Sequence, residues 1–165
     1  MRRRRGVAAA SLPALVGLAL ALGGCGLDTG TTCLDWGVYD TPGEAAEGAT
    51  VVVRASVVRD DGTERLWGVR ANRWVIEVDE VISGDMADVA AGEELTVVST
   101  PRTCTAGNEL YPAGDPLDTE DEVIVLVEDD TRFDVVRTLT PYDGVVEPGP
   151  DGGLPQIWPH GQHVF

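Results

Sequence analysis

The sequence predicts an all-β fold: a small five- to six-stranded OB-like closed barrel with one short N-terminal helix, preceded by a signal peptide. Two observations carry this prediction. Strand-forming runs rich in valine recur between turn signals from residue 50 to residue 146, and neither an internal repeat nor a heptad pattern is present. A sheet of this content on its own would expose an apolar face, so it must close into a barrel or stack as a sandwich. The barrel is predicted to span residues 41–140.

The single helix is predicted from a capping pattern at its start. Thr41 is a suitable N-cap, Pro42 takes the first helical position, and Glu44 stands three residues after the cap. Gly48 ends the helix after little more than a turn.

Alternating apolar residues predict the first two strands. Val51, Val53, Ala55 and Val57 share one face of a strand over 50–59, and a turn is expected in the Asp-Asp-Gly-Thr segment at 60–63. The next strand starts at Arg73 and reaches Ile82; its inward face consists of Trp74, Ile76 and Val78.

The second half of the chain predicts a shorter strand and a hairpin. Residues 95–100 form the third strand, which Pro101 ends, and residues 102–118 form a long loop. Residues 122–128 are nearly all apolar, as in a strand buried on both faces, and a turn leads from them into 133–139. Residues 141–165 read as a Gly/Pro-rich C-terminal extension.

The N-terminus predicts a lipoprotein signal peptide over residues 1–24. Four arginines precede an uncharged run from Gly6 to Leu22, which is the pattern of a secretory signal. The run is short for a membrane span and contains a proline. The segment Leu22-Gly23-Gly24-Cys25 resembles the lipobox of bacterial lipoproteins, in which the cysteine thiol takes a diacylglycerol and cleavage follows before it. We therefore expect lipidation of Cys25 and a cell-membrane location on the extracytoplasmic face; ordinary secretion and an uncleaved anchor are the alternatives. Residues 25–40 would hold the lipidated cysteine and a tether, flexible over 26–32.

The charge balance excludes one class of partner. After Cys25 the chain has eight arginines, no lysine and 28 carboxylates, a net charge of −20. Nucleic acid is excluded as a partner because its binding requires cations against phosphates. The absence of lysine, with the Ala/Gly/Val/Asp richness, is typical of GC-rich genomes such as those of actinobacteria.

Two cysteines, Cys33 and Cys104, follow the lipobox. In an oxidising exterior two thiols usually form a disulfide. The alternative is a pair of free redox thiols, although no C-x-x-C motif is present.

Three segments, ATVVVRASVV (49–58), WVIEVDEVISG (74–84) and LTVVSTPRTC (95–104), resemble in their order the tissue inhibitors of metalloproteinases and related netrin-like modules. The resemblance covers about residues 49–128. It implies a five-stranded OB barrel in which Cys33 and Cys104 occupy the places of the family's early disulfide. In the inhibitors the early cysteine is the free N-terminus that chelates zinc, whereas Cys33 is internal, so inhibition by that route is not expected. The segments DPLDTEDEVIVLV and LTPYDGVV resemble actinobacterial lipoproteins and imply no activity.

Few side chains suggest chemistry. Trp36, Trp67 and Trp158 are candidates to line a ligand groove, and the alternative is that they pack the termini over the barrel. His160 and His163 lie in the tail and do not complete a metal site or a catalytic triad. The acidic runs at 118–122 and 128–130 match no calcium loop and are expected to be solvated strand ends.

These observations favour a membrane-anchored lipoprotein that acts as a non-enzymatic binding or interaction module. It needs no cofactor or metal, and its partner would be an envelope or secreted protein. One alternative is a protease inhibitor of netrin-like fold that works without N-terminal zinc chelation. The other is an extracellular hydrolase that uses two convergent carboxylates.

Overall fold

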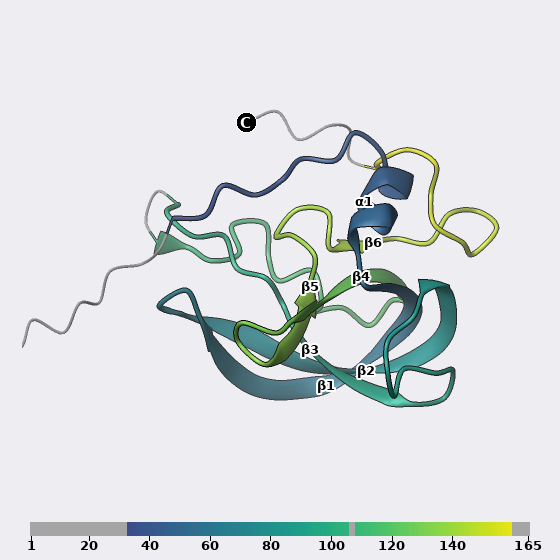
Figure 1. Cartoon of the computed structure of the whole chain (residues 1–165), viewed down its shortest axis with the longest axis horizontal. Helices are drawn as coiled ribbons and strands as arrows, with labels where there is room; N and C mark the ends of the chain where they lie inside the picture. Colours follow the sequence, from purple (N-terminus) through teal and green to yellow (C-terminus); the bar gives the residue numbers. More distant parts are fainter. Residues whose placement is uncertain (1–32, 106–107, 160–165) are drawn as a thin grey trace, which may run out of the picture.

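The computed structural model describes residues 33–105 and 108–159, and these residues form a mostly β structure (Figure 1). The elements in chain order are α1 (Pro42–Gly48), β1 (Val51–Leu66), β2 (Val69–Gly84), β3 (Glu94–Val98), β4 (Val123–Asp130), β5 (Val135–Thr138) and β6 (Val145–Val146). Within the described ranges no helix is both long and apolar enough to cross a membrane.

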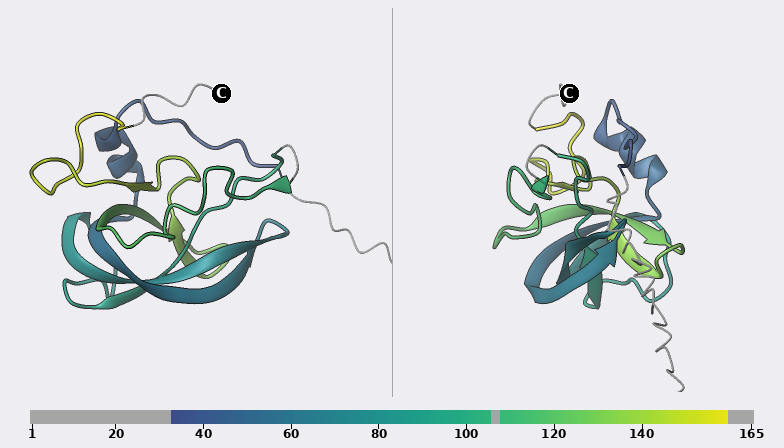
Figure 2. Two further views of the ribbon diagram at one scale, coloured as in Figure 1. Left: turned by 180° about the vertical axis from the view of Figure 1, so that it is seen from behind. Right: turned by 90° about the vertical axis from the view of Figure 1, so that its left-hand side faces the viewer.

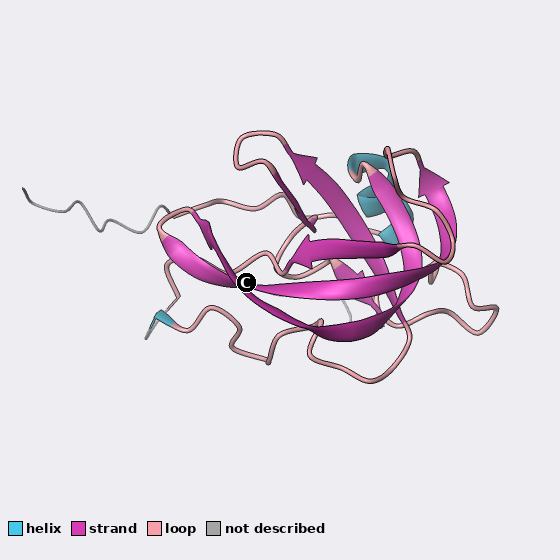
Figure 3. Ribbon diagram, turned by 90° about the horizontal axis from the view of Figure 1, so that it is seen from below, coloured by secondary structure: helices cyan, strands magenta, loops and turns pink. Residues whose placement is uncertain are grey.

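The six strands belong to one mixed sheet rather than to two stacked sheets. Neighbouring strands form a ring of hydrogen bonds in the order β1-β2-β3-β5-β4 and back to β1. All contacts in this ring are antiparallel except β3 with β5, which are parallel where Val98 meets Arg137. The long β1 and β2 strands curve together (Figure 1), and the strands of the sheet are drawn in magenta in Figure 3. β6 pairs with β4 outside the ring.

The hairpin of β1 and β2 is longer than the sequence predicts, and the turn predicted at 60–63 is wrong. Those residues lie inside β1, where the register shifts between Asp60 and Thr63. Gly62 has a φ of +87° and donates its N–H to the Asp60 carboxylate at 2.6 Å. Residues that are typical of a turn therefore form a β-bulge here and do not reverse the chain. The chain reverses at Trp67 and Gly68, where Trp67 has a φ of +47°.

The interior of the ring holds the main core. The predicted alternation is confirmed: Val51, Val53 and Ala55 of β1 pack there with Ile76 and Val78 of β2. We call this group the inner cluster; its other buried members are Val97, Leu117, Val123, Val125 and Val127. Leu117 comes from the long loop after β3 and is fully buried, so this loop supplies a core side chain as well as a connection.

A second cluster lies on the opposite face of the sheet, under α1. We call it the outer cluster: Ala45, Val52, Ile124, Leu126, Leu139, Val146 and Trp158. In Figure 2 α1 stands over the sheet beside the C-terminal segment. β4 contributes alternate residues to both clusters, which confirms the strand predicted to be buried on both faces. The predicted cap is confirmed as well, since the Thr41 hydroxyl accepts the N–H of Glu44 at 3.2 Å.

Candidate functional site

The three tryptophans predicted as groove residues lie in two separate places. Trp36 and Trp67 meet edge to face with ring centroids 5.1 Å apart, and Phe133 packs on Trp67 at 5.2 Å. Trp158 belongs to the outer cluster, and its indole N–H donates to the carbonyl of Tyr39 at 2.9 Å. Trp67 and Trp158 are buried and Trp36 is half-buried. These rings hold the ends of the described chain on the sheet; a role in ligand binding stays a prediction.

Arg137 fixes the Trp36–Trp67 pair to the sheet. Its guanidinium carbon lies 5.4 Å from the ring centroid of Trp36 and 5.3 Å from that of Trp67. Asp130 and Glu128 each place a carboxylate oxygen 2.8 Å from the guanidinium. Its Nη1 also donates to the carbonyls of Thr138 and Leu139. A buried arginine whose donors are paired in this way is part of the scaffold.

The predicted disulfide between Cys33 and Cys104 is confirmed. The two Cα atoms are 5.4 Å apart across a separation of 71 residues. Nearby, the N–H of Leu34 donates to the hydroxyl of Thr103 at 3.1 Å. The N-terminal segment is thus joined to the loop after β3. Cys25, predicted to be lipidated, lies outside the described residues, as do His160 and His163.

A groove of about 370 Å³ lies between β1 and the segment that leads into β4. Its lining residues are Val57, Val58, Arg59, Trp74, Asp118, Thr119 and Glu120. Val57 and Trp74 pack partly against the inner cluster, so the groove opens where the core approaches the surface. Its lining combines an aromatic ring and two valines with four polar or charged residues.

A β-bulge directs Val58 into this groove. The register between β1 and β2 shifts between Val57, which pairs with Ile76, and Arg59, which pairs with Val75. The extra residue, Val58, is 44% exposed and is one of three exposed large hydrophobic side chains among the described residues. Bulges re-aim side chains beside functional sites.

Asp115 and Tyr111 hold the wall of the groove in place. The indole N–H of Trp74 donates to the Asp115 carboxylate at 3.0 Å, which fixes the orientation of the ring. The Tyr111 hydroxyl donates to the carbonyl of Ser99 at 2.8 Å and accepts the N–H of Asn72 at 3.1 Å. Burial raises the pKa of Tyr111 above its usual range, the Asn72 N–H opposes this rise, and the charge on Asp115 adds to it.

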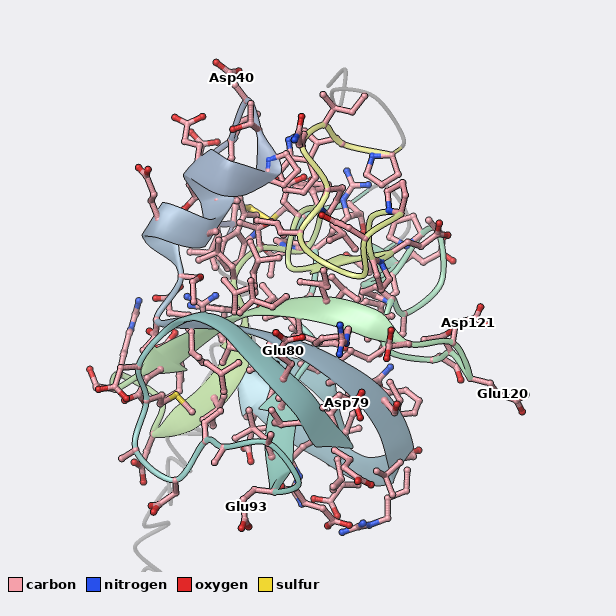
Figure 4. The ribbon with its side chains drawn as sticks, turned by 90° about the vertical axis from the view of Figure 1, so that its right-hand side faces the viewer. Asp40, Asp79, Glu80, Glu93, Glu120 and Asp121 are labelled. Carbon is pink, nitrogen blue, oxygen red and sulfur yellow. A yellow bond between two sulfur atoms is a disulfide. The ribbon has the colours of Figure 1, made fainter. Side chains whose placement is uncertain are left out.

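The rim of the groove is acidic. Asp118 and Glu120 are exposed, and neither is found in an ion pair within the described ranges. Arg59, the one cation of the lining, is paired with Glu94 at 3.1 Å. Figure 4 shows Glu120 and Asp121 projecting outward on the side of the molecule where β2 carries Asp79 and Glu80. The local field therefore favours a positively charged guest.

Among the described residues, pairs of carboxylates meet around arginines: Glu80 and Glu122 at Arg54, and Asp61 and Glu64 at Arg73. In the part of the chain that the structure describes, no three His, Cys, Asp or Glu side chains gather as a metal ion would require. Other described carboxylates accept hydrogen bonds from neighbouring groups, as Asp115 does from Trp74, or are exposed to solvent, as Asp118 and Glu120 are.

Two further cavities differ from the groove in their lining. One, of about 240 Å³, lies between the hairpin and β5 and contains Arg73 and Glu64, which pair with one another. Another, of about 500 Å³, lies within the C-terminal loop over residues 149–157, near the exposed Ile157. Neither has an oriented aromatic ring.

Sequence reasoning assigned Trp74 to the core and missed its contact with the groove. Its place on the inward face is confirmed by its packing against the inner cluster. The ring is nevertheless only half-buried, because β4 pairs with β1 no further than Ala55 and leaves the inner face open beyond that point. The length of a pairing between strands distant in sequence leaves no local signal.

Comparison of the chain with protein-family models, with curated proteins and with solved structures gives no significant match. The likeness of residues 49–128 to netrin-like modules therefore stays a prediction.

Proposed function

We propose that this protein is a lipid-anchored extracytoplasmic binding protein, without enzymatic activity of its own, that presents the groove beside Trp74 on an OB-like barrel. The observation that carries the binding role is the groove itself, with an oriented indole, an exposed valine and an acidic rim.

Two features support the extracytoplasmic, lipid-anchored location. The Leu22–Cys25 segment has the residues that lipoprotein processing requires, and the disulfide between Cys33 and Cys104 is typical of oxidising compartments. Two or three acyl chains hold a protein firmly on a membrane. The strand ring also supports the barrel, because five strands in this order with β3 parallel to β5 correspond to the OB type.

The anchor is tested by growing cells that make the full chain with an alkyne-tagged fatty acid. We expect the label on the wild-type protein and none on Cys25→Ala. A Cys33→Ser/Cys104→Ser variant should keep the label, which shows that the disulfide cysteines are not the acceptors. Equal labelling of the wild type and Cys25→Ala would contradict the proposal.

The groove is tested in the same cells with a photoreactive benzoylphenylalanine in place of Val58. The control places it at Val38, which is 55% exposed and lies outside the groove. We expect a discrete protein adduct from position 58, none from position 38, and a loss of the adduct when Trp74→Ala is added. Identical adducts from both positions would contradict a role for the groove.

A further inference from the structure

We propose that the groove takes an extended, positively charged segment of a partner protein, which adds as a strand to the open edge of β1. This inference rests on the proposed binding function and names the class of guest.

β1 has an edge that no strand covers along the groove. On that side β4 pairs with β1 only from Val51 to Ala55, and among the described residues no strand pairs with the edge beyond Ala55. The other edge of β1 is covered by β2 as far as Leu66. Backbone N–H and C=O groups that point away from a neighbouring strand form a template for another strand. An extended peptide is the guest that satisfies them.

The groove also offers contacts for the side chains of such a strand. Alternate residues of a strand point to the same face, so every second guest side chain would reach the surface made by Val57 and Trp74. Val58 lies beside this surface because of the bulge. Apolar residues at every second position of the guest would fit these contacts.

Charge determines the remaining guest positions. Asp118 and Glu120 line the groove, and Glu94 neutralises Arg59. With a net charge of −20 after Cys25, the whole molecule attracts a cationic segment and repels an anionic one. Lysine or arginine at the outward positions would therefore strengthen binding.

The same charge disfavours a second copy of this chain as the guest. Two copies would bring two strongly acidic surfaces together. The guest is thus a different protein.

The test uses the full chain, purified in detergent, and short fluorescent peptides of alternating lysine and valine whose binding is followed by anisotropy. Two further peptides have N-methyl groups on all lysines or on all valines, which blocks the N–H groups of one peptide edge while the charge stays the same. We expect the parent peptide to bind and one methylated peptide to bind about tenfold more weakly, because its methyl groups remove the hydrogen bonds of that peptide edge to β1. The affinity of the other methylated peptide should differ from that of the parent peptide by no more than about twofold. A glutamate–valine peptide should not bind.

Matched variants locate the site. Val58→Lys should lower the affinity for the parent peptide about tenfold. Val38→Lys makes the same charge change outside the groove and should keep this affinity within about twofold of the wild-type value. Equal affinities of the three cationic peptides, or equal effects of the two variants, would overturn the proposal in favour of diffuse charge attraction. A photo-adduct from position 58 without affinity for the cationic peptide would refute this guest class while leaving the binding function in place.

Discussion

At the scale of single residues, the carboxylate of Asp115 joins segments that are far apart in the sequence. It accepts hydrogen bonds from the side chains of Asn72 and Trp74 on β2, from the hydroxyl of Ser99 after β3, and from the N–H of Leu117 in its own loop. One acidic side chain therefore places both the core residue Leu117 and the groove residue Trp74. Nothing in the local sequence distinguishes Asp115 from its acidic neighbours, because its donors come from other elements.

Tyr111 gives this junction a measurable pH dependence. Burial raises the pKa of its phenol, so the folded chain keeps a proton that the unfolded chain loses above about pH 10. The free energy of unfolding should then fall as the pH rises above about 10, by up to about 1.4 kcal/mol per pH unit. Tyr111→Phe has no such proton, so its stability should fall less steeply over the same range. Urea unfolding of both proteins from pH 8 to pH 11 measures the two slopes, and parallel slopes would contradict this assignment.

At the scale of elements, the sequence predicts the types of strands well and their ends less well. The helix cap at Thr41 and the alternating faces of the strands are local patterns, and the structure confirms them. The wrong turn at 60–63 arises because Asp60 and Gly62 have the same local chemistry in a bulge as in a chain reversal. The actual reversal places Trp67 at positive φ, which no propensity rule favours. Packing of its ring against Trp36 and Phe133 accompanies that conformation.

Two glycines test how closely β1 and β2 approach one another. Gly62 and Gly84 have nearly the same positive φ, 87° and 80°, so replacement by alanine strains both backbones alike. A Cβ at Gly62 would meet nothing within 4 Å, whereas at Gly84 it would lie 2.8 Å from the Cα of Val51. We expect Gly62→Ala to lower the free energy of unfolding by about 1–2 kcal/mol. Gly84→Ala should lower the free energy of unfolding by about 1–3 kcal/mol more than Gly62→Ala, because the new Cβ would overlap with backbone atoms.

Urea unfolding of the two alanine variants measures this difference. Because Val51 pairs with both β2 and β4, Gly84→Ala should also weaken the protection of the β1–β4 amides in hydrogen exchange, and Gly62→Ala should not. Equal losses of stability in the two variants would mean that the strands can separate at Gly84 without cost.

At the scale of the whole molecule, the carboxylates differ in their surroundings. Some neutralise arginines, as Glu128 and Asp130 do for Arg137, and such pairs tie neighbouring segments together. Others, such as Asp118 and Glu120, remain exposed at the groove. The sequence predicts the total charge and what it excludes. It does not predict which carboxylates stay unpaired, because that division follows from the pairing of strands.

The disulfide connects the predicted membrane anchor to the ring of strands. Cys33 and Cys104 close a separation of 71 residues, so their replacement by serine should lower the free energy of unfolding by about 2–5 kcal/mol and raise the denaturant m-value. Reduction of the wild type should reproduce both changes. Trp36→Ala, with the disulfide intact, is the control: it removes packing on Trp67 but leaves the cross-link, so its m-value should stay that of the wild type. An unchanged free energy and m-value in the double serine variant would show that packing of Leu34 and Trp36 alone fixes this end of the chain.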